Sequence, residues 1–137
     1  MVERCNSGQN WLALVVDDEE PIRLTLSAIL QLNRFAVVSA ASARDACEWL
    51  HREQFDLVIT DLKMEKETSG FEVTECAAKH CPNGKTIILS AYAKLAVDWQ
   101  KHGAHAFCQK PTSTTDLLRV IDGLLAKSSS DRRGVTL

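Results

Sequence analysis

The sequence Leu-Ala-Leu-Val-Val-Asp-Asp occupies positions 12–18 and changes abruptly from apolar residues to acidic ones. A short apolar run that contains β-branched residues is typical of a strand buried on both faces of a parallel sheet. Similar runs follow at residues 35–40, 57–60, 87–89 and 104–108. The strict polar alternation of a half-exposed antiparallel sheet is missing. The pattern therefore predicts five parallel strands covered by helices.

Helical patterns separate these runs. Pro21 lies where a first helical turn tolerates proline. Three spacings that resemble capping boxes predict further helix starts: Ser42-x-x-Asp45, Ser69-x-x-Glu72 and Ser113-x-x-Asp116. The last helix carries one apolar stripe: Leu117, Leu118, Ile121, Leu124 and Leu125. This order of elements predicts five β-α units in an open, doubly wound α/β sheet.

The length of 137 residues fits one domain, with 45% hydrophobic residues and a net charge of −2. We expect the domain at residues 11–127, a flexible N-terminus at 1–10 and a tail or linker start at 128–137. The chain carries no basic stripe, which argues against direct nucleic-acid binding. It has no apolar run of about 20 residues and no signal-peptide pattern, so we expect no membrane segment.

The five cysteines are odd in number and form no C-x-x-C pair. This usage favours reduced thiols in a cytoplasmic protein over a disulfide framework. Cys76, His80 and Cys81 lie close together and could suggest a metal site. Because the usual zinc-ligand spacings are absent, we prefer a helix end with incidental cysteines.

Polar residues follow four of the five predicted strands, at the edge where ligands bind to such a sheet. Asp17 and Asp18 follow the first strand, Asp61 the third, Ser90 the fourth and Lys110 the fifth. Taken singly, each has an ordinary explanation: acids at a helix start, a turn residue or a surface charge. The prediction of a site rests on all of them meeting at one edge.

Three carboxylates in one pocket repel one another, and a divalent cation such as Mg²⁺ relieves that repulsion. One carboxylate can then attack a phosphoryl group, while Ser90 and Lys110 provide a hydrogen bond and a positive charge for its oxygens. This set of groups suits phosphoryl transfer, in which positioning and electrostatics do most of the catalysis.

The residues at 14–20, 59–64, 89–92 and 103–111 resemble the motifs of response-regulator receiver domains. The resemblance extends over residues 11–127. It implies a flavodoxin-like sheet of five parallel strands in the order 2-1-3-4-5, with five helices. It also implies a cis bond between Lys110 and Pro111.

The resemblance assigns a role to each site residue. It makes Asp61 the phosphoacceptor, with Ser90 and Lys110 as the other catalytic residues. Asp17, Asp18, Asp61 and the backbone carbonyl of Lys63 would bind Mg²⁺, for which Mn²⁺ can substitute. Ser90 and Phe107 would form the conformational switch.

Some positions depart from the family pattern. Glu65 stands where proline is usual, the loop before Gly70 is one residue longer, and the stretch from Ser90 to Gly103 is about two residues shorter. The shorter stretch puts the start of the fourth helix in doubt. Trp99 is either an exposed partner contact or packed in a helix groove.

We therefore expect a signalling switch and not a metabolic enzyme. The phosphoryl donor would be a sensor histidine kinase or a histidine phosphotransfer protein, and slow self-catalysed hydrolysis would reset the switch. The output would pass to a downstream target or effector domain through the fourth helix, fifth strand and fifth helix, with a homodimer as an open option.

The alternative is a degenerate receiver that binds partners without phosphorylation. A haloacid-dehalogenase-type phosphatase would need Asp-x-Asp after the first strand, and a flavodoxin-like electron carrier would need a phosphate loop where this chain is acidic.

Overall fold

The computed structural model describes residues 11–92 and 98–133, with side chains up to residue 126. Five parallel strands form one sheet in the order β2-β1-β3-β4-β5. Their bounds are β1 Trp11–Val16, β2 Phe35–Ala40, β3 Leu57–Thr60, β4 Lys85–Ser90 and β5 Ala106–Gln109. The predicted doubly wound sheet and its strand order are confirmed.

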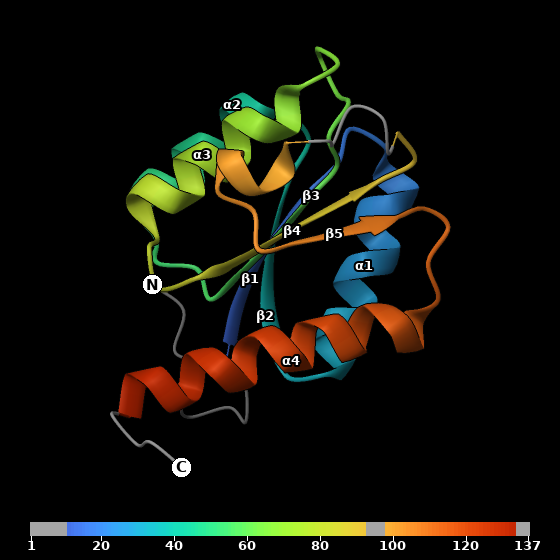
Figure 1. Cartoon of the computed structure of the whole chain (residues 1–137). Helices are drawn as coiled ribbons and strands as arrows, with labels where there is room; N and C mark the ends of the chain where they lie inside the picture. Colours follow the sequence, from blue (N-terminus) through green and yellow to red (C-terminus); the bar gives the residue numbers. More distant parts are fainter. Residues whose placement is uncertain (1–10, 93–97, 134–137) are drawn as a thin grey trace.

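Helices cover both faces of the sheet. Their bounds are α1 Glu20–Leu32, α2 Ala43–Arg52, α3 Ser69–His80 and α4 Thr114–Arg133. Figure 1 shows α2 and α3 on one face of the sheet and α1 and α4 on the other. In the described part of the chain, no helix is long and apolar enough to cross a membrane.

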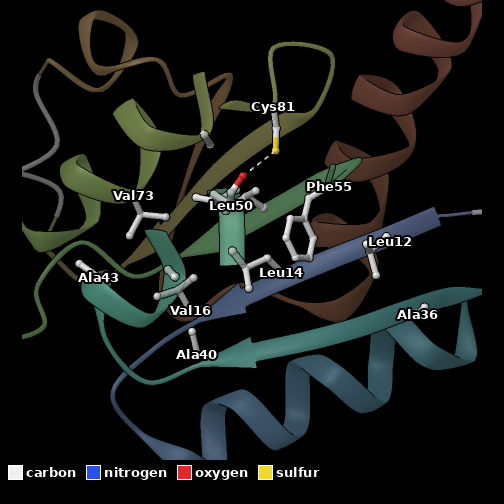
Figure 2. Packing of buried hydrophobic residues seen from close by; sticks show 13 residues of the cluster. Leu12, Leu14, Val16, Ala36, Ala40, Ala43, Leu50, Phe55, Val73 and Cys81 are labelled. Carbon is white, nitrogen blue, oxygen red and sulfur yellow. Dashed lines mark hydrogen bonds between the residues drawn. The ribbon is translucent and has the colours of Figure 1, made fainter. Parts of the chain in front are cut away.

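Strand β1 explains why the first apolar run does not alternate with polar residues. Leu12, Leu14 and Val16 belong to the cluster that β1 forms with α2 and α3, part of which is drawn in Figure 2. Ala13 and Val15 belong to the cluster on the opposite face, together with α1 and α4. Because both faces are buried, every residue of this strand from Leu12 onward is apolar.

Helices begin at or directly after all three predicted positions, and two of the three predicted serine caps are confirmed. Ser42 Oγ accepts a hydrogen bond from the backbone N–H of Asp45 at 3.1 Å, and Ser113 Oγ accepts one from Asp116 at 3.0 Å. Helix α3 does begin at Ser69, but the predicted capping role of this residue is wrong, because its side chain does not cap the helix. Ser69 Oγ instead accepts a hydrogen bond from the backbone N–H of Lys66 at 2.8 Å, so it fixes the loop before α3.

The segment between β4 and β5 differs from the expectation. Its described residues contain a single 3-10 turn, η2 Trp99–His102, and residues 93–97, where the predicted fourth helix would lie, are outside the described residues. The described chain thus contains four α-helices where five were expected. Helix α4 also continues to Arg133, past residue 127, where we placed the end of the domain.

Candidate functional site

The sheet brings the two acidic strand ends together. Val16 pairs with Thr60 in the register of β1 and β3, so Asp17 and Asp61, the next residues, lie side by side. The backbone N–H of Asp61 donates to the carbonyl oxygen of Val16 at 2.9 Å. Asp17 is only 2% exposed and Asp61 only 7%. Two carboxylates at this depth need a positive partner or protonation.

Lys110 is that positive partner. Its Nζ lies 3.0 Å from Asp17 Oδ2 and 3.6 Å from Asp61 Oδ2. The lysine follows β5, and its backbone N–H donates to the carbonyl oxygen of Ser90 at the end of β4 at 2.9 Å. The predicted convergence of Asp17, Asp61, Ser90 and Lys110 at one edge of the sheet is thus observed. The Lys110–Pro111 bond is cis, as expected.

The surroundings shift the pKa values of Asp61 and Lys110. Burial raises the pKa of Asp61, against the opposing charge of Lys110, and the charge of Asp17 adds to the increase. For Lys110, burial lowers the pKa, but its hydrogen bond to Asp17 and the charges of both aspartates outweigh this and raise it. Lys110 therefore remains an ammonium at neutral pH.

Backbone contacts hold Asp61 in place. Its Oδ1 accepts the backbone N–H of Leu62 at 2.7 Å, and its carbonyl oxygen accepts the hydroxyl of Thr60 at 2.8 Å. Gly70 passes so close to this backbone that a Cβ atom would lie 2.3 Å from the Asp61 carbonyl oxygen. Only glycine fits at this position without a shift of the backbone at Asp61 and Leu62.

The acidic residues after β1 could hold a hard cation. Carboxylate oxygens of Asp17, Asp18 and Glu19 all lie within 4.8 Å of one another. Asp17 is buried, whereas Asp18 and Glu19 are exposed, so an ion can reach the group from solvent. An all-oxygen set of this kind fits Mg²⁺. Glu19 was not among the predicted ligands.

Lys63 lies beside the site, and its side chain covers an aromatic ring. Its Nζ is 4.7 Å from the centroid of the Tyr92 ring, in cation–π geometry. The predicted role of the Lys63 backbone carbonyl as a metal ligand stays a prediction.

The two predicted switch residues lie on neighbouring strands. Ser90 is fully buried, and its Oγ accepts the backbone N–H of Tyr92 at 3.1 Å. Phe107 pairs with Ile88 across β5 and β4 and packs, half-buried, on a cluster that includes Leu62. Phe107 thus packs on the same cluster as Leu62, the residue that follows Asp61. Trp99 packs on the same cluster and is half-buried, which favours the packed alternative for this residue.

Sequence reasoning missed two contacts at the edge of the site. Arg23 Nη1 donates to the backbone carbonyl oxygen of Asp17 at 2.8 Å. The Glu65 carboxylate accepts the backbone N–H of Ala43 at 3.2 Å. Its negative charge is stabilised there by the positive end of the α2 dipole. The only signal for Glu65 was its departure from the family's proline, and nothing in the sequence pointed to Arg23.

Comparison with known proteins identifies the family. The five-stranded parallel sheet with helices on both faces matches the fold of CheY-like receiver domains. The family model described as "Response regulator receiver domain" matches residues 13–122, and the chain belongs to this family.

Individual relatives agree with this assignment. The transcriptional regulatory protein GlrR of Escherichia coli K12 is 33% identical over 118 residues, which are 85% of this chain and 26% of GlrR. The chain thus spans about a quarter of the length of that relative. A CheY-like receiver domain protein from Methanospirillum hungatei has 30% identity and a TM-score of 0.82, covering 88% of this chain and 98% of its own. TrrA from Thermotoga maritima, solved in complex with Mg(2+)-BeF, has 30% identity and a TM-score of 0.74, covering 83% and 98%.

Proposed function

We propose that this chain accepts a phosphoryl group on Asp61 from a phosphohistidine of a partner protein. The observation that carries the proposal is the position of Lys110, whose Nζ lies 3.0 Å from Asp17 and 3.6 Å from Asp61. A degenerate receiver would not need a buried acidic pair held by a lysine, since burying these charges costs free energy. We therefore favour the phosphoacceptor over the phosphorylation-independent alternative.

The transfer breaks the P–N bond of the donor imidazole and forms a P–O bond to a carboxylate oxygen of Asp61. The donor imidazole leaves with the electron pair of the broken bond and takes up a proton. Lys110 and the hydroxyl of Ser90 stabilise the negative charge on the phosphoryl oxygens. Slow attack of water on the acyl phosphate then releases inorganic phosphate, restores the Asp61 carboxylate and resets the protein.

Mg²⁺ would be held by Asp17, Asp18, Asp61 and the backbone carbonyl of Lys63, and Mn²⁺ can substitute. When bound, the ion neutralises charge on the transferring group. The oxygen ligands around Asp17 support this choice, as does the Mg(2+)-BeF complex of the relative TrrA.

The phosphoryl donor would be a sensor histidine kinase or a histidine phosphotransfer protein. A cytoplasmic location is consistent with the free cysteines.

The signal is a change of conformation. The hydroxyl of Ser90 moves to the phosphoryl group, and Phe107 then turns inward. The output surface consists of β5, α4 and the segment before η2, part of which lies outside the described residues. A downstream protein or effector domain, or a second copy of the chain, would bind there. This is a population shift that follows a local change of charge.

Phosphoramidate tests the transfer, because its P–N bond resembles that of phosphohistidine. Intact-mass spectrometry should find one added phosphoryl group with Mg²⁺, and none with EDTA or in the Asp61→Asn variant. Equal labelling of the variant and the wild type would remove Asp61 from this role.

The switch is tested with Ser90→Ala and beryllofluoride, a phosphoryl mimic. Labelling should persist in this variant, while NMR shift changes at β5 and α4 become smaller than in the wild type. If these changes spread equally far in both proteins, Ser90 does not couple the site to Phe107.

A further inference from the structure

Helices α2 and α3 each carry a cysteine four residues before a histidine. The pairs are Cys47 with His51 on α2, and Cys76 with His80 on α3. Residues four apart lie on the same face of a helix. The two faces meet, because Cys47 Sγ lies 3.8 Å from the carbonyl oxygen of Glu72 on α3. Figure 1 shows the two helices side by side on one face of the sheet.

Three of these side chains converge on a point. A ring nitrogen of His51, Cys76 Sγ and a ring nitrogen of His80 all lie within 4.8 Å of one another. The ring centroids of His51 and His80 are 3.9 Å apart. His51 is exposed and the other two are half-buried, so an ion can enter from solvent. Cys47 interacts with Cys76 and its sulfur lies 3.8 Å from the Glu72 carbonyl oxygen, but it is not part of the group whose ligand atoms converge.

The hydrogen bond of His51 prepares its ring for a metal. His51 Nδ1 lies 2.7 Å from the carbonyl oxygen of Cys47. A carbonyl oxygen can only accept, so Nδ1 carries the proton and Nε2 presents its lone pair. Metal-binding histidines generally donate their second ring N–H to a carbonyl or carboxylate in this manner.

We propose that His51, Cys76 and His80 bind one Zn²⁺ ion, with a water molecule as the fourth ligand. Two imidazoles and a thiolate are the donor types that Zn²⁺ takes in proteins. On binding, the Cys76 thiol releases its proton to solvent as the sulfur–metal bond forms. The site differs in class from the all-oxygen pocket at Asp17 and Asp61, which suits Mg²⁺.

The linear spacing of cysteines and histidines argued against a metal site at Cys76. The helix pairing changes this interpretation, because His51 comes from a different helix and completes the set. Cys81, which the sequence grouped with Cys76 and His80, is buried with its sulfur 3.4 Å from the carbonyl oxygen of Glu53. A Zn²⁺ ion would join α2 to α3 and stabilise the folded chain by mass action.

Cobalt provides the test, because thiolate coordination gives Co²⁺ a charge-transfer absorption that a carboxylate site cannot produce. The full chain, with thiols reduced and Mg²⁺ in excess to fill the acidic pocket, is titrated with Co²⁺ and then with Zn²⁺. We expect the absorption to saturate at one Co²⁺ per chain and to disappear on addition of Zn²⁺.

Single variants distinguish the proposed ligands from the other cysteines. Cys76→Ser should remove the absorption, and His51→Gln or His80→Gln should weaken Co²⁺ binding by about tenfold or more. Cys47→Ser and Cys108→Ser should keep the absorption. Circular dichroism and phosphoramidate labelling of each variant show whether the fold and the Asp61 site are intact. Absence of the absorption in the wild type, or its equal loss in Cys47→Ser and Cys76→Ser, would overturn the proposed ligand set.

Discussion

Lys110 Nζ lies 3.0 Å from Asp17 Oδ2, although β3 and β4 separate the strands that these two residues follow. The lysine side chain therefore extends across the carboxyl edge of the sheet and contacts Asp61 on the way. This arrangement makes the candidate site and the stability of the fold depend on the same charges.

Replacing Lys110 with methionine should destabilise the fold. Removing one partner of a fully buried ion pair costs about 3–5 kcal/mol, and we expect roughly 2–3 kcal/mol here because the pair is partly solvated. The Lys110 side chain is 19% exposed, against 2% for Asp17. Urea denaturation measures the loss.

A double-mutant cycle with Asp61→Asn is the control for Lys110→Met. With Asp61 neutral, Lys110→Met leaves only one uncompensated carboxylate, so its cost should fall by at least about 0.5 kcal/mol. Equal costs in the two backgrounds would mean that Lys110 and Asp61 do not interact.

Mg²⁺ should stabilise the unphosphorylated protein. An ion that binds only the folded pocket adds about 1.4 kcal/mol for each tenfold excess over its dissociation constant. The melting temperature should rise with Mg²⁺ and should change less with KCl of the same ionic strength, which controls for screening. Asp18→Asn should weaken the response. A melting temperature that is insensitive to Mg²⁺ in the wild type would contradict the proposed metal site.

Gly70→Ala should destabilise the protein and shift the backbone at Asp61 and Leu62. The new Cβ atom would lie 2.3 Å from the Asp61 carbonyl oxygen and 2.7 Å from Leu62 Cα, both of them backbone atoms. Overpacking of this kind costs about 1–3 kcal/mol. Chemical denaturation gives the loss, and slower phosphoramidate labelling should accompany it.

Gly123→Ala is the matched control for Gly70→Ala. A Cβ atom at Gly123 meets no atom within 4 Å, and this residue lies in α4. Because glycine is a poor helix former, the change should stabilise the protein by about 0.5–1 kcal/mol. Similar effects at the two glycines would contradict the close approach at Gly70.

His105 should make stability depend on pH. Burial and the charge of Lys85 lower its pKa, and its Nδ1 accepts the backbone N–H of Thr86 at 3.0 Å. The unfolded chain takes up this proton more readily than the folded chain. The contribution of His105 to the free energy of unfolding is therefore fully present above the unfolded pKa of about 6.5 and is lost as pH falls through the folded pKa. His105→Asn should flatten the pH dependence of unfolding below about pH 6.5. NMR titration of the ring in Lys85→Gln should give a higher pKa than in the wild type, and an unchanged value would contradict the role of Lys85.

The strands could be predicted because helices cover both faces of the sheet, which makes each run apolar. The limits of β4 were less clear: Lys85 and Thr86 belong to the strand, but they are polar and were left outside the prediction. Strand β5 was placed too early, because His105 and Ala104 precede it and pack at its start.

The site residues could be predicted because each lies at or directly after the carboxyl end of a strand, and parallel strands end at the same edge. Contacts that depend on how helices and loops are oriented could not. Glu65 reaches the start of α2, and His51 meets Cys76 across two helices. Glu65 and Ala43 are 22 residues apart in sequence, and the meeting of His51 with Cys76 depends on the rotation of one helix against another. Residue patterns specify neither contact.

Borohydride reduction tests most directly whether Asp61 carries the phosphoryl group. An acyl phosphate of aspartate is reduced by borohydride to homoserine, and peptide mass spectrometry then locates the modified position. After incubation with phosphoramidate and Mg²⁺, we expect homoserine at position 61 and unmodified aspartate at positions 17, 18 and 56. Homoserine at one of those three positions, or an intact Asp61 in a chain that has gained a phosphoryl group, would contradict it.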